Sequence, residues 1–335
     1  MLATKLISLL VFCAKISAQP RTVPPDAAVI VRGSGTQTGE FHTIQAAVAS
    51  LPGDSSAQVI FVYPGTYTEQ VHLTRAGNLT MMGYTESTKS YTANTVRLSF
   101  NLSQEQVGGG DLAATLRIDA NNFSLYNIDV VNTFGPHNAT GAQALAVAGY
   151  GTNLGFSAVG FYGYQDTLRA EKGVQFYGLC YIEGAVDFIF GQHGHAFFHR
   201  NTIASVGPGA ITADGPDTSD ESLFVINESN ITTSAAATTD LTGQVFLGRP
   251  WSAQAQVAYI SCWLDTLINS AGWEPWSASM PQTDGVLFAE YASTGPGAVG
   301  PRAPFATQLA SPIGYGIAEV LGANWGAWVD AAYYI

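Results

Sequence analysis

Short apolar segments return along the chain at a nearly constant interval of about 22 residues, and this recurrence constrains the fold more than any other feature. One segment covers positions 153–161, the next covers 174–182, and the equivalent position returns again at Ala196. Each segment holds two short β-rich stretches divided by Gly, Asn or Ser. Such a period with little helical pattern predicts a parallel β-helix, whose coils stack about 4.8 Å apart because no coil can bury its apolar face alone.

A β-sandwich is the alternative fold. Its strands would alternate with turns every ~8–12 residues and would show no longer repeat. The chain keeps the longer repeat from residue 57 to residue 265, and no interior linker interrupts it. We therefore predict an all-β solenoid that forms one domain over residues 19–335.

One segment follows a helical pattern instead. Residues 41–50 place Ile44, Ala47 and Val48 on one face, and Thr43 stands where a helix-capping residue is expected. A solenoid exposes apolar groups at its open ends, which a helix can cover. We predict an N-terminal capping helix.

The N-terminal segment, residues 1–18, has the pattern of a secretory signal peptide. Lys5 supplies a positive charge, residues 6–14 form a short apolar run, and residues 16–18 end in small side chains. That run is too short to cross a bilayer, which takes ~20 apolar residues, and no later segment is long enough. A buried N-terminal helix is the alternative interpretation. We expect a secreted, extracellular protein that does not span a membrane.

Sequons for N-glycosylation agree with export. They stand at Asn78, Asn101, Asn122, Asn138, Asn227 and Asn230. Asn227 and Asn230 are so close together that we expect one glycan at most on this pair.

The chain is acidic, with 13 Lys and Arg against 25 Asp and Glu and a formal net charge of −12. Nucleic-acid binding depends on basic side chains that contact phosphates, so the charge argues against that class of protein.

Three cysteines are too few for a disulfide scaffold. Cys13 lies in the leader, which leaves Cys180 and Cys262, each inside an apolar segment. One disulfide between these two is possible in a secreted protein, but we favour two buried free thiols.

Polar side chains interrupt the apolar segments at the same period. Gln143, Gln165 and Asp187 follow one another at intervals of about 22 residues, and Asp166 precedes Asp187 by about 21 residues. Residues one period apart are neighbours on successive coils, so two amides and two carboxylates are expected to converge on one patch. Gln165 and Asp166 would face opposite sides of a flat strand, so a bulge or a strand end is needed at residues 164–167. Turn capping is the alternative role for each residue taken singly.

Arg249 and Trp251 form a further candidate pair, in the sequence LGRPW at 247–251. An arginine can hold a carboxylate in bidentate geometry and keep it ionised, and an indole offers a flat face to a sugar ring. The alternative is a packing tryptophan beside a solvated arginine.

Seven segments of the chain, in this order, resemble the signature segments of the pectin methylesterases (pectinesterases, carbohydrate esterase family 8). They are GTYTE (65–69), QALA (143–146), GYQDT (163–167), DFIFG (187–191), LGRPW (247–251), AGWEPW (271–276) and EYASTGPGA (290–298). The resemblance covers residues 29–300, and the wording of residues 181–187 is closer to the fungal than to the plant type. It implies a right-handed, single-stranded parallel β-helix of the pectin-lyase-like kind.

The resemblance also implies an activity, the hydrolysis of C6 methyl esters in homogalacturonan (pectin) with release of methanol. It makes Asp187 the nucleophile that forms a covalent intermediate and Asp166 the acid and base. Gln165 and Gln143 correspond to the amides that stabilise the oxyanion, and Arg249 to the residue that orients Asp187. We expect no cofactor and no metal.

Substrate contacts follow from the same resemblance. Trp251 and Phe190 correspond to aromatic residues that contact sugar, and Arg249 and Gln143 to further binding residues. Many relatives carry an aromatic residue three positions after the acid, where this chain has Arg169. A cation there could favour stretches of pectin with free carboxylates or lie at the rim of the cleft. We expect a monomer that acts on plant cell-wall pectin and, because it is acidic, releases the polyanionic product readily, which favours scattered attack and an acidic optimum.

Other interpretations are open at this point. His193, His195 and His199 share one face of a strand, but no acidic or cysteine partner accompanies them as a metal site would require. A solenoid pectate lyase would need an Asp-rich calcium cluster, and a polygalacturonase would use carboxylates across a glycosidic bond. Neither requires the pair of glutamines. A β-helix that binds the wall without catalysis is the third possibility.

Overall fold

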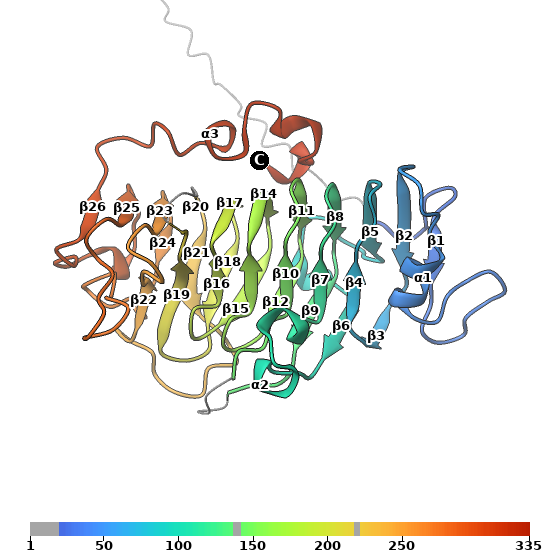
Figure 1. The fold of residues 1–335 in the computed structure, drawn as a ribbon, viewed down its shortest axis with the longest axis horizontal. Coiled ribbons are helices and arrows are strands. Elements are labelled where there is room, and N and C mark those ends of the chain that lie inside the picture. The colour runs from blue at the N-terminus through green and yellow to red at the C-terminus, as the bar shows by residue number, and fades with distance from the viewer. Residues whose placement is uncertain (1–19, 137–141, 218–221) are drawn as a thin grey trace, which may run out of the picture.

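The computed structural model describes residues 20–136, 142–217 and 222–335, and it shows a solenoid with three parallel β-sheets (Figure 1). Each coil in the middle of the solenoid supplies one strand to each sheet in turn, as β14, β15 and β16 do (172–178, 181–184 and 189–191). The predicted parallel β-helix is confirmed. The predicted leader at 1–18 and the sequon at Asn138 lie outside the described residues.

The first sheet has 11 strands, which follow one another in chain order. They are β1 (Val29–Val31), β2 (Gln58–Val62), β5 (Leu79–Gly83), β8 (Phe123–Tyr126), β11 (Leu154–Ser157), β14 (Lys172–Gly178), β17 (His193–His199), β20 (Leu223–Asn227), β23 (Gln256–Ile260), β25 (Leu287–Tyr291) and β26 (Ala306–Gln308). The second sheet has seven strands. They are β4 (Val71–Leu73), β7 (Leu116–Ile118), β10 (Val147–Gly149), β13 (Leu168–Ala170), β16 (Ile189–Gly191), β19 (Gly209–Asp214) and β22 (Val245–Gly248).

The third sheet has eight strands. They are β3 (Gly65–Thr68), β6 (Val96–Phe100), β9 (Asp129–Asn132), β12 (Gly160–Tyr162), β15 (Tyr181–Gly184), β18 (Thr202–Ser205), β21 (Asn230–Thr233) and β24 (Trp263–Leu264). Helices are few and short. They are α1 (Ile44–Ser50), α2 (Gln104–Val107), α3 (Ile317–Leu321) and the 3-10 turns η1 (Tyr91–Ala93), η2 (Gly110–Ala113), η3 (Pro296–Ala298), η4 (Trp325–Ala327) and η5 (Ala331–Tyr333).

A single left-handed residue turns the chain from the first sheet into the third on coil after coil. This residue has a φ of 51° at Ala158, 55° at Leu179 and 53° at Arg200. The sequence pattern predicts Gly, Asn or Ser at the kink, and that expectation is wrong at these three coils. A left-handed residue other than glycine costs of order 1 kcal/mol, and the stacked coils on either side impose it here.

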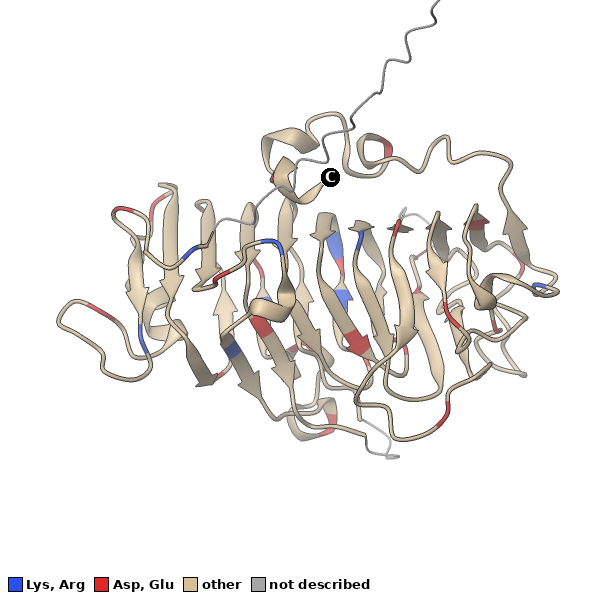
Figure 2. Cartoon of the chain, turned by 180° about the vertical axis from the view of Figure 1, so that it is seen from behind, with Lys and Arg blue, Asp and Glu red and all other residues tan. Residues whose placement is uncertain are grey.

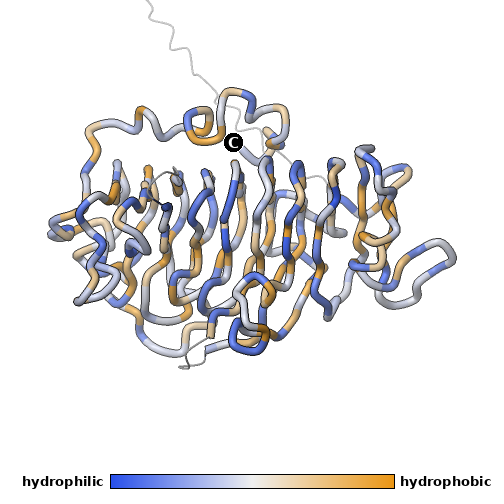
Figure 3. Tube along the Cα trace, viewed as in Figure 1, coloured by the Kyte–Doolittle hydropathy of each residue, from blue (hydrophilic) through white to orange (hydrophobic). Residues whose placement is uncertain are grey.

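Ladders of apolar side chains fill the interior of the solenoid. Hydrophobic residues recur from coil to coil along the chain (Figure 3). Phe156, Tyr177 and Phe198 are in register on three successive strands and stack with ring centroids 4.8 and 4.5 Å apart. The phenol of Tyr177 donates to the buried side-chain oxygen of Gln175 over 2.6 Å. Stacking at this spacing is what parallel coils impose on identical positions.

The two cysteines occupy the same ladder without meeting. Both are buried free thiols, as favoured from the sequence, and burial raises the pKa of each to about 12. The amide of Cys180 donates to Asn201, whose own amide donates to Ser229. Cys262 stands on the coil after Ser229, so three coil spacings, about 14 Å, separate the cysteines, well beyond the ~7 Å limit for a disulfide.

Helix α1 covers the N-terminal end of the solenoid, as predicted (Figure 1). Thr43 accepts a hydrogen bond from the amide of Ala46, and Ile44 and Ala47 are buried. The carboxylate of Glu69 accepts from the amides of Ile44 and Gln45 at 2.7 and 2.9 Å. A carboxylate at the first turn satisfies free amides and complements the helix dipole.

The C-terminal segment, residues 309–335, returns along the outer face of the first sheet (Figure 1). Ile317, Val320 and Leu321 pack on that face against Phe176 and Phe197. The phenol of Tyr333 donates to the carbonyl of Thr88, far away in sequence. This segment gives the outer face of the first sheet an apolar core of its own.

Charged residues are sparse along the coils (Figure 2). Among the described residues, no helix has the length and the apolar character needed to cross a lipid bilayer.

We expect Phe198→Ala to lower the free energy of unfolding by about 3–5 kcal/mol, because it leaves a cavity in the fully buried aromatic ladder. Ile313→Ala, at a side chain that is 86% exposed, is the control and should change stability by no more than about 0.5 kcal/mol. Denaturant unfolding measures both, and equal losses would contradict the importance of the ladder.

Candidate active site

Asp166 and Asp187 occupy equivalent turns on neighbouring coils, each between a strand of the third sheet and a strand of the second. Gln165 pairs with Val186, so the residues that follow, Asp166 and Asp187, are in register. Both adopt left-handed conformations, with φ of 62° and 50°. The strand end expected at residues 164–167 is therefore a turn at Asp166. In a flat strand Gln165 and Asp166 would point to opposite faces, and the turn removes this restriction.

The register differs by one residue from coil to coil. Asp166 and Asp187 lie opposite each other on neighbouring coils, because Gln165 pairs with Val186. Gln165 therefore does not lie opposite Asp187, although the sequence interval between them also matches the coil length. One coil earlier, the amides of Ala146 and Val147 both donate to the carbonyl of Thr167. One residue is therefore extra on the coil of Ala146, and the register shifts by one residue there. The amide of Ala144 donates to the carbonyl of Gln165, which places Gln143 on the coil beside Gln165.

Arg249 holds Asp187 in bidentate geometry. Its Nε and Nη2 donate to the two carboxylate oxygens of Asp187 over 2.8 and 2.6 Å. The Asp187 residue is only 6% exposed, and burial raises its pKa while the guanidinium opposes the rise. Arg249 itself lies 4.4 Å from the centroid of the Trp276 ring. The contact keeps Asp187 in one orientation and favours its ionised form.

Asp166 has the opposite electrostatic setting. Burial raises its pKa well above the ordinary value, the charge of Asp187 raises it further, and Arg169 and Arg249 oppose the rise. No hydrogen bond or ion pair joins the Asp166 side chain to another described residue. These opposed influences favour the proton on Asp166 and the negative charge on Asp187.

A cavity of about 470 Å³ opens beside these residues. Its lining includes Gln143, Asp166, Arg169, Phe190 and Trp251, along with Gln104, Gln192 and Trp276. Gln165, Asp187 and Arg249 are not among the lining residues, although the charge of Asp187 reaches Asp166. The Oε1 atom of Gln143 is buried and has no partner among the described residues.

Phe190 and Trp251 stand next to each other at this cavity, with ring centroids 6.2 Å apart. Phe190 lies on β16, and the amide of Trp251 donates to the carbonyl of Asp214 at the end of β19. Two aromatic rings that line a cavity together with polar side chains are suited to contact a carbohydrate.

Several residues at the site were not predicted from the sequence. Glu171 and Gln192 stand on successive coils at the same interval as Asp166 and Asp187, so the period could have found them. Gln104, Asp111 and Trp276 come from excursions outside the coils, where no period exists. The arrangement can stabilise one ionised carboxylate beside one protonated carboxyl, which suits acyl transfer.

Two of the three histidines singled out in the sequence, His193 and His199, have contacts of other kinds. The ring of the buried His199 contacts the side-chain amide of Asn227 over 2.9 Å and the carbonyl of Ile335 over 3.3 Å. His193 lies 4.0 Å from Asp217. A second cavity, of about 640 Å³, lies beside the third sheet, lined by Arg97, Tyr162 and other residues, and includes none of the predicted site residues.

Comparisons with known proteins place this parallel β-helix among enzymes that act on pectin esters. The sequence profile of the Pectinesterase family matches residues 28–303. A pectinesterase from Aspergillus niger is 42% identical, with 98% of each chain covered, and one from Aspergillus aculeatus is 40% identical, with 96% and 97% covered. The chain belongs to the pectinesterase family.

Solved structures agree with this assignment. The crystal structure of the Aspergillus niger pectin methylesterase superposes with a TM-score of 0.86 at 37% identity, covering 94% of this chain and 100% of that one. The carrot pectin methylesterase gives a TM-score of 0.79 at 26% identity, covering 92% and 96%. A pectin methylesterase in complex with a hexasaccharide gives 0.76 at 25% identity, covering 89% and 98%. The C-terminal segment lies beyond the stretch that the family profile matches.

We expect Arg249→Leu to destabilise the protein by about 3 kcal/mol, because it leaves the buried Asp187 carboxylate without a partner. The double variant Arg249→Leu with Asp187→Asn should recover most of that loss, since no unpaired charge is then buried. Denaturant unfolding at neutral pH measures both variants. A double variant no more stable than Arg249→Leu alone would contradict the electrostatic cause.

Proposed function

We propose that this chain is a secreted pectin methylesterase that hydrolyses the C6 methyl esters of homogalacturonan. The observation that carries the proposal is the asymmetric pair of carboxyls, with Asp187 clamped by Arg249 and Asp166 beside it in a cavity lined by aromatic residues. Membership of the pectinesterase family supports the substrate class. A solved relative bound to a hexasaccharide supports a carbohydrate in the groove.

In the first half of the reaction, a carboxylate oxygen of Asp187 attacks the C6 ester carbonyl. The carbonyl π electrons move to its oxygen, and the amides of Gln143 and Gln165 donate hydrogen bonds to this oxyanion. The tetrahedral intermediate then expels methoxide, which takes the proton of Asp166 and leaves as methanol. The product of this half is an anhydride between Asp187 and the galacturonate C6 carboxyl.

In the second half, Asp166 is ionised and acts as the base. It takes a proton from a water molecule, whose oxygen attacks the C6 carbonyl of the anhydride. The bond to Asp187 breaks, the carboxylate of Asp187 is regenerated, and Asp166 is again protonated. The raised pKa of Asp166 suits it to both tasks, because an acid must hold its proton and a base must be able to regain it.

Binding of the sugar chain uses Trp251, Phe190, Gln143 and Arg249. The two aromatic rings offer apolar faces to sugar rings, and the unpartnered Oε1 of Gln143 can accept a hydrogen bond from a sugar hydroxyl. Arg249 contributes chiefly through the orientation of Asp187.

We also infer the setting in which the enzyme works. The leader pattern at residues 1–18 and the sequons favour an extracellular protein, and one crystallised relative carries an N-acetylglucosamine stub on an asparagine. The apolar core runs through the coils from β1 to β25, which favours one domain over residues 19–335. The protein acts as a monomer, and plant cell-wall pectin is its substrate.

Asp187→Asn and Asp166→Asn should each lower methanol release from methylated pectin by at least about 10³-fold, because one removes the nucleophile and the other the acid. Asp129→Asn, a partly buried carboxyl on β9 away from the cavity, is the matched control and should stay within about threefold of the unchanged protein. Full activity in either site variant would refute its role. Shortened or unsaturated chains without methanol would favour a polygalacturonase or a lyase instead.

A pH profile tests the division of roles. The rate should fall at low pH as Asp187 gains a proton and at high pH as Asp166 loses its proton. Arg169 lowers the pKa of Asp166, so Arg169→Gln raises that pKa and should move the alkaline limb of kcat/KM to higher pH. Glu105→Gln, at an exposed residue of α2, should leave the limb in place. A shift to lower pH in Arg169→Gln would contradict Asp166 as the acid.

A further inference from the structure

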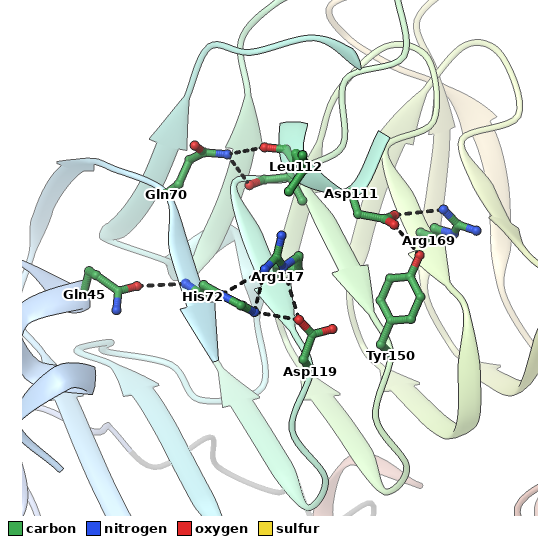
Figure 4. Close-up of polar contacts among 10 residues, drawn as sticks. Gln45, Gln70, His72, Asp111, Leu112, Arg117, Asp119, Tyr150 and Arg169 are labelled. Atoms are coloured by element: carbon green, nitrogen blue, oxygen red, sulfur yellow. Dashed lines mark hydrogen bonds and ion pairs between the residues drawn. The ribbon is translucent and has the colours of Figure 1, made fainter. Parts of the chain in front are cut away.

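Arg169 is already paired with two carboxylates at the edge of the cavity. Its Nη1 donates to Asp111 over 2.8 Å and its Nε donates to Glu171 over 2.7 Å. The phenol of Tyr150 donates to the other oxygen of Asp111 over 2.5 Å. Figure 4 shows Asp111, Tyr150 and Arg169 pointing toward one another from three different elements. We refer to Asp111, Tyr150, Arg169 and Glu171 as the Arg169 cluster.

The cluster lies at the boundary between the catalytic cavity and its neighbour. Arg169 lines the cavity of about 470 Å³ that contains Asp166. Asp111 and Tyr150 line an adjacent cavity of about 260 Å³, which also includes Arg117 and Asp119. In the second sheet, Arg169 pairs in register with Phe190 toward the C-terminal side. Arg169 thus lines the same cavity as Asp166, so a sugar unit bound there next to the reacting ester can meet the cluster.

The cluster has a surplus of negative charge. One guanidinium faces two carboxylates, so its formal charge is −1. The side chains of Arg169 and Glu171 are 16% and 7% exposed, so water screens them weakly. Because Nε and Nη1 are engaged, Arg169 cannot bind an incoming carboxylate through the Nε edge without giving up a partner.

The faces around the guanidinium are aromatic. The centroids of the Phe190 and Tyr150 rings lie 5.5 and 5.4 Å from its central carbon. A methyl ester brings a neutral, apolar group beside these rings at no electrostatic cost, whereas a free carboxylate meets Glu171 and Asp111 with like charge.

We propose that the Arg169 cluster makes the substrate position beside the reacting ester selective for a methyl-esterified galacturonate over a free one. This inference rests on the proposed function and assigns a substrate preference to the same site. From the sequence alone, a cation at position 169 could favour free carboxylates. The proposed preference is the opposite, because Asp111 and Glu171 more than offset the charge of Arg169.

The preference has a consequence for the product. Each turnover converts a neutral ester into a carboxylate, and a chain that places this new carboxylate against the cluster is bound less well. Attack on the immediate neighbour on that side is therefore disfavoured, and the esters are removed at separated positions along the chain.

The test compares two substrates that differ in their fraction of free carboxylates. These are a highly methylated homogalacturonan and the same polymer partly de-esterified at random with alkali. The readout is the ratio of kcat/KM for methanol release, per ester, on the second substrate to that on the first. A ratio removes effects on the chemical step that both substrates share.

Asp111→Asn frees one side of Arg169 and should raise this ratio by about threefold or more, the size expected for one partly exposed charge. Arg169→Gln leaves the carboxylates without their cation and should lower the ratio. Glu105→Gln makes the same charge change as Asp111→Asn, on the neighbouring α2, and should leave the ratio unchanged. If Asp111→Asn fails to fold by circular dichroism, Glu171→Gln replaces it with the same expected sign.

A ratio that rises in Asp111→Asn and falls in Arg169→Gln supports the proposal, and a ratio that rises in both variants overturns it. Ratios equal to that of Glu105→Gln, or a ratio that falls in Asp111→Asn, overturn the proposal while methanol release by the unchanged protein leaves the proposed function standing. Absence of methanol from either polymer with the unchanged protein would refute the proposed function itself.

Discussion

Parallel hydrogen bonding between successive coils is the constraint on which the rest of this structure depends. Each coil can satisfy its backbone groups and bury its apolar side chains only against the coils before and after it. The stacking imposes left-handed turn residues at Ala158, Leu179 and Arg200, and it brings Asp166 and Asp187 into register although a whole coil of chain separates them. The same geometry that builds the core thus assembles the site.

Charge at the site is arranged in opposed pairs. Asp187 has Arg249 as its partner, which opposes the rise in its pKa that burial causes, whereas Asp166 has no ion-pair partner among the described residues, and burial and the charge of Asp187 both raise its pKa. Beside them Arg169 is outnumbered by Asp111 and Glu171. In a chain of low charge content these few groups dominate the local electrostatic field. In our proposal, a neutral ester therefore binds beside them better than an anionic carboxylate does.

Much of this arrangement could be predicted from the sequence, because the solenoid converts a linear period into proximity. The coil length and the convergence of Asp166 with Asp187 follow from that period, and the capping helix with Thr43 follows from a helical pattern of apolar residues. Three things do not. The one-residue irregularity at Ala146 and Val147 leaves no mark on the pattern of apolar residues. Asp111 reaches Arg169 from the excursion at η2, and the C-terminal segment covers the first sheet through contacts that have no period. The catalytic roles are still predictions.

The distance between the two thiols bears on how the protein can be made. Cys180 and Cys262 are held three coils apart inside one ladder, so the folded state contains no cross-link between them whose formation needs an oxidant. Folding is therefore indifferent to whether this pair encounters a reducing or an oxidising compartment. The burial that shields both sulfurs also protects them from peroxide, so a storage medium free of thiol reductants is sufficient for this pair.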